Sequence, residues 1–141
     1  MNQKIGGFGR LFKQIDECMA RRLNNSLQRL DLTASQMHFL MALNCHGGTL
    51  ALKEMEELFN MAQSTVAGLA ARLEKKELVV TVPDPTDRRV KRIQITEKGR
   101  AAFRAATDDM LETEHLITSP LSEEEREALY SMLERVYENI K

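Results

Sequence analysis

The sequence predicts a mainly helical chain with one small β-hairpin, and two observations support this fold class. Apolar residues recur every three or four positions along most of the 141 residues, which is the spacing of helices that bury one face. The pattern changes only in residues 78–95, where two short β-branched runs, LVVTV and IQI, flank a charged turn. Two such runs around a turn are typical of a hairpin, and the length of this turn predicts that its tip projects.

One long amphipathic helix is predicted for the first thirty residues. A helix of this length needs a surface along its whole apolar face, and either the rest of the chain or a second copy of the chain can supply it. The apolar residues of this face are Ile5, Phe8, Phe12, Ile15, Met19, Leu23, Leu27 and Leu30.

Local signals mark the ends of two shorter helices. Thr33 and Gln36 have the spacing of a capping box, so we expect the second helix to begin after Thr33. It should end before Gly47-Gly48, because glycine favours the backbone conformation that terminates helices. The third helix is expected at 52–59, with Asn60 closing it.

A fourth helix is predicted at about 64–76. Val66, Leu69 and Leu73 form its inner face. The residues expected on or near the opposite face are Gln63, Ser64, Thr65, Gly68 and Arg72.

Two further helices are predicted after the hairpin. An alanine-rich helix begins at Thr96, with Gly99 as an unusual residue in its first turn, and Pro120 breaks it. Ser122 and Glu125 have the spacing of a second capping box. The apolar stripe of the last helix comprises Leu129, Met132, Leu133, Val136 and Ile140.

Composition argues against several classes of protein. No apolar run approaches the ~20 residues that cross a bilayer, so no contact with a membrane is expected. Lys4 and Arg10 bracket a glycine-rich stretch where a signal peptide would be apolar, so we expect a cytoplasmic location. Nucleophile motifs and glycine-rich phosphate loops are also missing, so we expect neither an enzyme nor a cofactor. No standard metal-ligand spacing is formed by His38, Cys45, His46 and His115.

The two cysteines leave two interpretations open. Cys18 and Cys45 are too few for a disulfide framework, so both are expected as reduced, packed thiols. Alternatively, Cys18 is a redox sensor, because Arg21 and Arg22 lie within one helical turn and cations favour the reactive thiolate.

The formal net charge of -1 conceals an uneven distribution of charge along the chain. Residues 63–100 contain nine Lys and Arg against five Asp and Glu, whereas residues 101–141 contain four against ten. Local basicity determines whether a surface attracts polyanions. The cations on and beside the hairpin tip are Arg88, Arg89, Lys91 and Arg92.

Two short helices joined by a turn and followed by a hairpin make a winged helix-turn-helix. The major groove of B-DNA admits one α-helix, whose exposed face should carry small polar side chains such as Gln63, Ser64 and Thr65. A cationic hairpin tip would reach the neighbouring minor groove, whose negative potential attracts arginine. Each part has a plain alternative, a helix cap at Ser64 and Thr65 and a solvated turn at the tip. Their combination favours double-stranded DNA as the partner.

The chain resembles one known family over nearly its whole length, and two stretches carry the resemblance. The stretch DRRVKRIQITEKG, with Asp87, Arg89, Thr96 and Gly99, resembles the wing of the MarR-type regulators, and STVAGLAARLEKKELV resembles their recognition helix. The resemblance implies a sequence-specific DNA-binding homodimer that acts as a ligand-released repressor of transcription. It also implies dimerisation helices at 1–30 and 100–141 and a DNA-binding lobe at 33–98.

The resemblance implies roles for the wing residues as well. Arg89 would enter the minor groove, and Asp87 would orient it and brace the wing. Arg88 and Lys91 would contact phosphates, whereas Arg92 would turn elsewhere on its strand. The implied effector is a small aromatic acid that binds between the dimer base and the lobe.

Three departures from the family's pattern keep other functions open. Gly68 stands where a polar or basic residue is common, Thr81-Val82 where arginines often precede the wing, and Glu77 where glycine is frequent. Each departure removes a positive charge or alters a turn, so one alternative is a protein-interaction module with weak or lost DNA binding. A thiol-based redox-sensing regulator that acts through Cys18 is the other.

Overall fold

The computed structural model describes residues 6–141, so Ile5, expected at the start of the first helix, lies outside the described residues. Apart from one additional strand, the elements follow in the predicted order. They are α1 (Gly7–Arg29), α2 (Ala34–Cys45), β1 (Thr49–Ala51), α3 (Leu52–Phe59), α4 (Gln63–Lys75), β2 (Val79–Pro83), β3 (Lys91–Ile95), α5 (Glu97–Thr118) and α6 (Glu123–Ile140).

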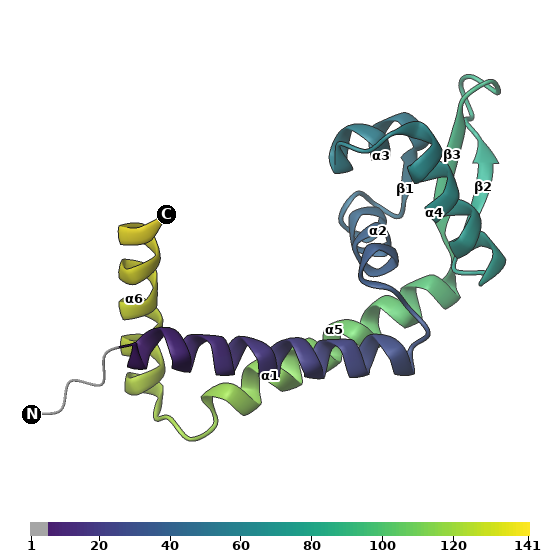
Figure 1. Ribbon diagram of the computed structural model, residues 1–141. Coiled ribbons are helices and arrows are strands. Elements are labelled where there is room, and N and C mark those ends of the chain that lie inside the picture. Colours follow the sequence, from purple (N-terminus) through teal and green to yellow (C-terminus); the bar gives the residue numbers. More distant parts are fainter. Residues whose placement is uncertain (1–5) are drawn as a thin grey trace, which may run out of the picture.

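The molecule consists of a long base with a lobe at one end, as Figure 1 shows. The helices α1 and α5 lie side by side along the base, and the lobe contains every element from α2 to β3. At the other end of the base, α6 stands apart from the lobe. None of the helices in the described range is long and apolar enough to cross a bilayer.

The sheet has three antiparallel strands in the order β1-β3-β2, whereas the sequence predicted only the hairpin of β2 and β3. The missed strand β1 comprises only Thr49–Ala51 and leads directly into α3. Three residues are too few to show the alternation by which strands are recognised. Because β1 covers its outer edge, β3 is the central strand of the sheet.

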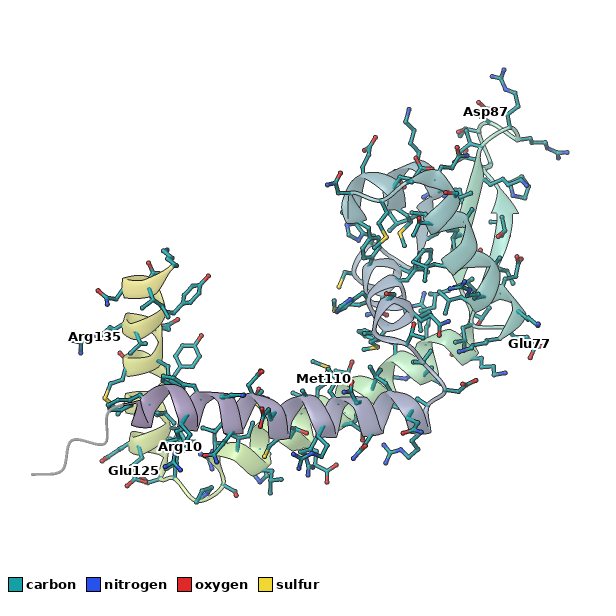
Figure 2. All side chains as sticks on the ribbon, viewed as in Figure 1. Arg10, Glu77, Asp87, Met110, Glu125 and Arg135 are labelled. Carbon is teal, nitrogen blue, oxygen red and sulfur yellow. The ribbon has the colours of Figure 1, made fainter. Side chains whose placement is uncertain are left out.

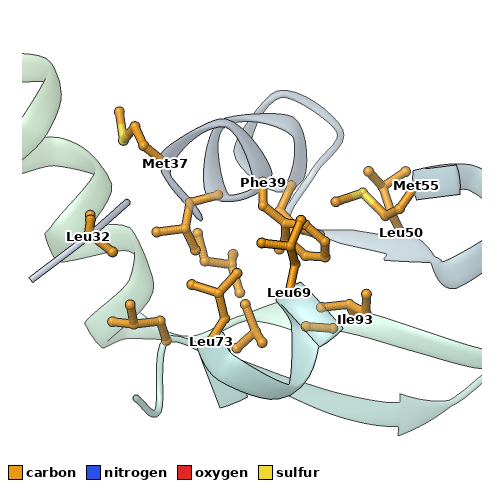
Figure 3. Close-up of a cluster of buried hydrophobic side chains, with 14 of the residues drawn as sticks. Leu32, Met37, Phe39, Leu50, Met55, Leu69, Leu73 and Ile93 are labelled. Carbon is orange, nitrogen blue, oxygen red and sulfur yellow. The ribbon is translucent and has the colours of Figure 1, made fainter. Parts of the chain in front are cut away.

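The hydrophobic core of the lobe lies between α2, α4 and the sheet (Figure 3). Phe39 of α2, Leu73 of α4 and Ile93 of β3 are fully buried there. Leu27 and Leu32, at the end of α1 and just beyond it, join the same core and connect it to the base. Full burial of a large apolar side chain contributes about 1.5–3 kcal/mol, so the core holds α4 and the hairpin on one stable support. The inner face predicted for α4 is confirmed, because its three residues are all buried.

The two predicted capping boxes are present. The backbone N–H of Gln36 donates to Thr33 Oγ1 over 3.1 Å, and Thr33 N–H donates to Gln36 Oε1 over 3.2 Å. The same pair of bonds joins Ser122 and Glu125, over 3.2 and 2.8 Å. Each box satisfies N–H groups that the first helical turn leaves without a partner.

Three helices end on a residue other than glycine in the left-handed backbone region. These residues are Asp31 after α1, Asn60 after α3 and Glu77 after α4. After α4, the N–H of Leu78 donates to the carbonyl of Leu73 over 3.0 Å, which closes a Schellman turn, and both leucines are buried in the core. This turn fixes the direction in which the chain leaves α4 and enters the wing.

Gly99 in the first turn of α5 has a steric cause. A Cβ atom at this position would overlap the carbonyl oxygen of Leu78 and would lie 2.8 Å from Cγ1 of Ile95. The backbone of α5 therefore approaches the start of the wing more closely than any residue with a side chain allows.

Candidate nucleic-acid interface

The N-terminus of α4 presents polar side chains to solvent. Gln63, Ser64 and Thr65 are all exposed. The N-cap position is Ala62, and no side chain caps the helix there, so the interpretation of Ser64 and Thr65 as a simple helix cap is wrong. A helix N-terminus without a side-chain cap is electropositive and has N–H groups to offer, which suits an anion such as phosphate.

The remainder of the α4 face contains one cation and one position without a side chain. Arg72 is exposed, whereas Gly68 is half-buried. A Cβ atom at Gly68 would meet no other atom within 4 Å, so nothing in this lobe requires glycine there. Because Gly68 has no side chain, the backbone of α4 is accessible there to a docked partner.

The wing turn is organised by the carboxylate of Asp84. This group accepts hydrogen bonds from Thr86 Oγ1 over 2.6 Å, from Thr86 N–H over 2.8 Å and from Asp87 N–H over 3.2 Å. These donors, with the Thr86 hydroxyl first among them, lower the pKa of Asp84 from 3.8 to about 2. The carboxylate therefore stays ionised and keeps the turn folded.

Asp87 pairs with Arg89 at the tip of the wing. Arg89 Nε donates to Asp87 Oδ1 over 3.1 Å, and Arg89 Nη2 donates to Oδ2 over 3.3 Å. These bonds to Arg89 lower the pKa of Asp87. The guanidinium nevertheless remains in solvent, because the side chain of Arg89 is 92% exposed. Asp87 thus orients Arg89 without burying it.

The other wing cations divide into two kinds. Arg88 and Lys91 are exposed, and their expected contacts with phosphates stay a prediction. Arg92 instead turns back to the lobe, where Nε donates to Thr49 Oγ1 and Nη1 to Asp84 Oδ2, each over 3.3 Å. Figure 2 shows the exposed tip, marked by Asp87, projecting beyond the rest of the lobe and away from the base.

The two residues at which arginine often precedes the wing in the family, Thr81 and Val82, carry no charge. Thr81 and Val82 are half-buried on β2. The N–H of Thr81 donates to Glu74 Oε1 of α4 over 3.2 Å, so this part of the strand is bound to the helix beside it.

A cleft of about 620 Å³ lies between α1 and α5 in the base. Met19, Leu23 and Met110 are its larger apolar lining residues. Ser26 Oγ donates to the Asp109 carboxylate and lowers the pKa of that group, and Arg29 pairs with the same carboxylate. The charged residues of the lining are Asp16, Arg22, Arg29, Asp109, Glu112 and Glu114.

The cysteines and histidines do not assemble into a metal site. Cys18 and Cys45 are both exposed, which contradicts the expectation of packed thiols. Arg22, one of the two arginines expected to activate Cys18, donates instead to Thr113 Oγ1 of α5 over 3.1 Å. Within residues 6–141, no three His, Cys, Asp or Glu side chains are grouped closely enough to hold a metal ion.

Sequence reasoning missed the contacts that fix the wing to the lobe. Arg92 was expected to turn elsewhere on its strand, but its partner Thr49 could not be named, because it is 43 residues away along the chain. A weak signal was present, because Arg92 stands one position before the buried Ile93 and so lies on the opposite face of β3 from the core. Which residues meet it there depends on β1, which the sequence did not predict.

Comparison with known proteins gives the family. The MarR family model matches residues 30–90. The HTH-type transcriptional regulator MhqR of Bacillus subtilis is 32% identical over 132 residues, which are 94% of this chain and 88% of MhqR. YfiV of the same species, also an HTH-type transcriptional regulator, is 37% identical over 120 residues, or 80% of this chain and 72% of YfiV.

Solved structures agree with this result. The MepR–DNA complex of S. aureus matches with a TM-score of 0.87 and 30% identity, over 94% of this chain and 99% of MepR. MepR has also been solved with bound ethidium bromide. YusO of Bacillus subtilis matches with a TM-score of 0.88 over 97% of this chain and 96% of YusO, but at 23% identity it supports the fold alone. The chain belongs to the MarR family of winged-helix, DNA-binding transcriptional regulators.

Proposed function

We propose that the chain acts as a homodimeric repressor whose two lobes read duplex DNA and which a small ligand releases from its operator. In each subunit α4 enters the major groove and the wing enters the minor groove beside it. Arg89 lies in the minor groove with Asp87 as its brace, and Arg88 and Lys91 contact phosphates. The α4 residues that face the major groove are Gln63, Ser64, Thr65, Gly68 and Arg72.

The observation that carries this proposal is the solvent-exposed, oriented guanidinium of Arg89. An exposed ion pair such as that of Arg89 with Asp87 contributes only about 0–1 kcal/mol to the stability of a chain. The fold itself therefore gains little from holding Arg89 at the tip. A complex with DNA is stabilised much more by this arginine, because a narrow minor groove concentrates negative potential around an inserted arginine.

The alternative, a protein-interaction module, is less consistent with the same surface. Partner-protein interfaces centre on apolar and aromatic residues. The wing tip instead presents Arg88, Arg89 and Lys91, with Val90 as its exposed apolar residue. An electrophoretic mobility shift with the chain's own promoter region separates the two functions, because only the regulator retards that fragment at low ionic strength.

Replacement of Arg89 by alanine tests the proposed role of the wing. Arg89→Ala should weaken binding of the promoter duplex by about 1–3 kcal/mol and should reduce the salt dependence of binding, because one cationic contact is lost. Fluorescence anisotropy with a labelled duplex at several salt concentrations measures both quantities.

Arg135→Ala is the matched control for charge, since Arg135 lies on α6 at the end of the molecule opposite the wing (Figure 2). It should bind DNA as the wild type does. Equal affinities of Arg89→Ala and the wild type would contradict the assignment of the wing.

The homodimer is supported by the exposed apolar surface of the base. None of the 18 residues of α6 is buried against the described remainder of the chain. Tyr130, Tyr137 and Ile140 on this helix are each more than 60% exposed, and Phe8 on α1 is 83% exposed. Contiguous apolar surface of this kind marks an interaction site in a soluble protein. A second copy would cover it and would hold two lobes about one DNA turn apart.

The cleft between α1 and α5 is the proposed effector site. Its volume of about 620 Å³ suits a small ligand. The aromatic acid implied by the family resemblance would need Arg22 or Arg29 as its partner. A cationic ligand is the second candidate, because the lining has four carboxylates against two guanidinium groups.

Separate binding measurements with the two ligand classes identify the effector's charge. Binding of salicylate and of ethidium should be measured separately by calorimetry on the protein without DNA, because ethidium also intercalates into duplex DNA. Asp109→Asn removes one carboxylate and should weaken binding of the cation, whereas Arg22→Gln should weaken that of the acid. If neither ligand binds the protein in calorimetry, the assignment of the cleft is wrong.

A further inference from the structure

Arg92 differs from the other cations on and beside the wing tip because its guanidinium group is paired with groups of the lobe. Its side chain is 24% exposed, compared with 92% for Arg89. All three guanidinium nitrogens have partners. Besides the bonds to Thr49 Oγ1 and Asp84 Oδ2, Nη2 donates to the carbonyl oxygen of Thr49 over 3.5 Å and lies 4.0 Å from Glu54 Oε2.

The partners of Arg92 belong to three different parts of the lobe. Asp84 holds the wing turn through its bonds to Thr86 and Asp87. Thr49 belongs to β1, and Glu54 lies in the first turn of α3, where its carboxylate also accepts the N–H of Ala51 over 2.7 Å. A single side chain thus connects the wing turn, the edge strand and the helix that precedes α4.

A second connection holds the other edge of the wing. Thr81 N–H of β2 donates to Glu74 Oε1 in the last turn of α4. The wing is therefore tied to α4 on one edge and, through Arg92, to β1 and α3 on the other. These ties connect the wing to α4 and to the rest of the lobe in the absence of any partner.

We propose that Arg92 is a positioning residue for DNA binding, which fixes the angle of the wing and thereby places Arg89 relative to α4. This inference rests on the proposed role of Arg89 in the minor groove. A wing that is already in place loses less conformational entropy when it binds than one that must be ordered by the DNA. Arginine is required because its planar guanidinium donates in several fixed directions at once, whereas a lysine ammonium acts as a single charge.

The competing explanation is that Arg92 leaves these partners and contacts a phosphate directly. The two explanations differ in how Arg92 depends on Arg89. If Arg92 acts mainly by placing Arg89, its removal has a much smaller effect once Arg89 is gone. If it contacts DNA by itself, the two losses add.

A double-mutant cycle of Arg92→Leu and Arg89→Ala, measured by anisotropy with the promoter duplex, makes this distinction. Arg92→Leu alone should weaken binding about tenfold, an effect of the size expected from loss of one arginine contact. In the Arg89→Ala background the same change should cost less than about twofold. Arg92→Lys should remain as weak as Arg92→Leu. Arg135→Leu, the same substitution on α6, should bind normally.

Thr49→Val provides the second variant, and it carries the test if Arg92→Leu does not fold by circular dichroism. It keeps the shape of Thr49 and removes the acceptor of Arg92 Nε, so affinity should fall by about threefold, and only when Arg89 is present. Additive losses in either cycle, or full affinity in Arg92→Lys, would overturn the positioning role alone. Normal binding by Arg89→Ala would overturn the wing assignment and the positioning role together.

Discussion

The backbone conformation of Glu77 destabilises the folded chain, and its side chain offsets only a small part of this cost. Its φ of 63° lies in the left-handed region, which costs roughly 1–2 kcal/mol for a residue with a Cβ. The turn is held there because Thr96 Oγ1 donates to the Glu77 carbonyl over 2.7 Å. The carboxylate offsets little of this cost, since its partner Lys98 is 3.4 Å away and both side chains are largely exposed.

Glu77→Gly should therefore raise the free energy of unfolding by ~0.5–1 kcal/mol. Glycine adopts a positive φ without strain, although its greater freedom in the unfolded chain removes part of the gain. Urea unfolding at one fixed protein concentration measures the change. Glu77→Ala is the control, because it removes the carboxylate and keeps the strain. An equal gain in both variants would show that the carboxylate, and not the backbone, was destabilising.

At the scale of elements, the wing turn depends on the ionised carboxylate of Asp84. Its pKa of about 2 lies below the value of about 3.9 expected for an unfolded chain. A lowered pKa means that the stabilisation is present above the unfolded value and is lost as the pH falls through the folded one. The order of the wing should therefore persist at pH 4 and disappear near pH 2.

An NMR titration of the Asp84 carboxyl carbon tests this expectation directly. The midpoint should lie near 2, and the amide signals of Thr86 and Asp87 should shift at the same pH, because both N–H groups donate to this carboxylate. In Thr86→Val the midpoint should rise toward 3.8, since the Thr86 hydroxyl is the largest cause of the lowered pKa. A wild-type midpoint at 3.8 would contradict this account of the turn.

Elements with local signals were predictable from the sequence, and contacts between distant segments were not. The caps at Thr33 and Ser122 and the end of α3 at Asn60 are encoded within four residues, and each lies where it was predicted. Pairing of β1 with β3 joins segments more than forty residues apart, as does the contact of Arg92 with Thr49. The sequence therefore predicted the cations of the wing tip, but not the contacts between distant segments that hold the wing in place.

For the whole molecule, the lobe and the base differ in how they are stabilised. The lobe contains a core of fully buried residues, to which the base contributes Leu27, Leu32 and Ala106. The outer base has no such core within the described chain, because α6 buries none of its residues and Leu133 on its apolar stripe is 40% exposed. Disruption of the outer base should therefore leave the lobe folded.

Leu133→Glu should separate the proposed dimer without unfolding the lobe. A carboxylate in an apolar interface loses its hydration without gaining a partner, so the dissociation constant should rise about a hundredfold or more. Sedimentation velocity should show a dimer for the wild type and a monomer for the variant. Binding of the promoter duplex should fall with it, since specificity requires two lobes on two half-sites. Ser131→Glu adds the same charge to the opposite face of α6 and should remain dimeric; a monomeric wild type would refute the arrangement.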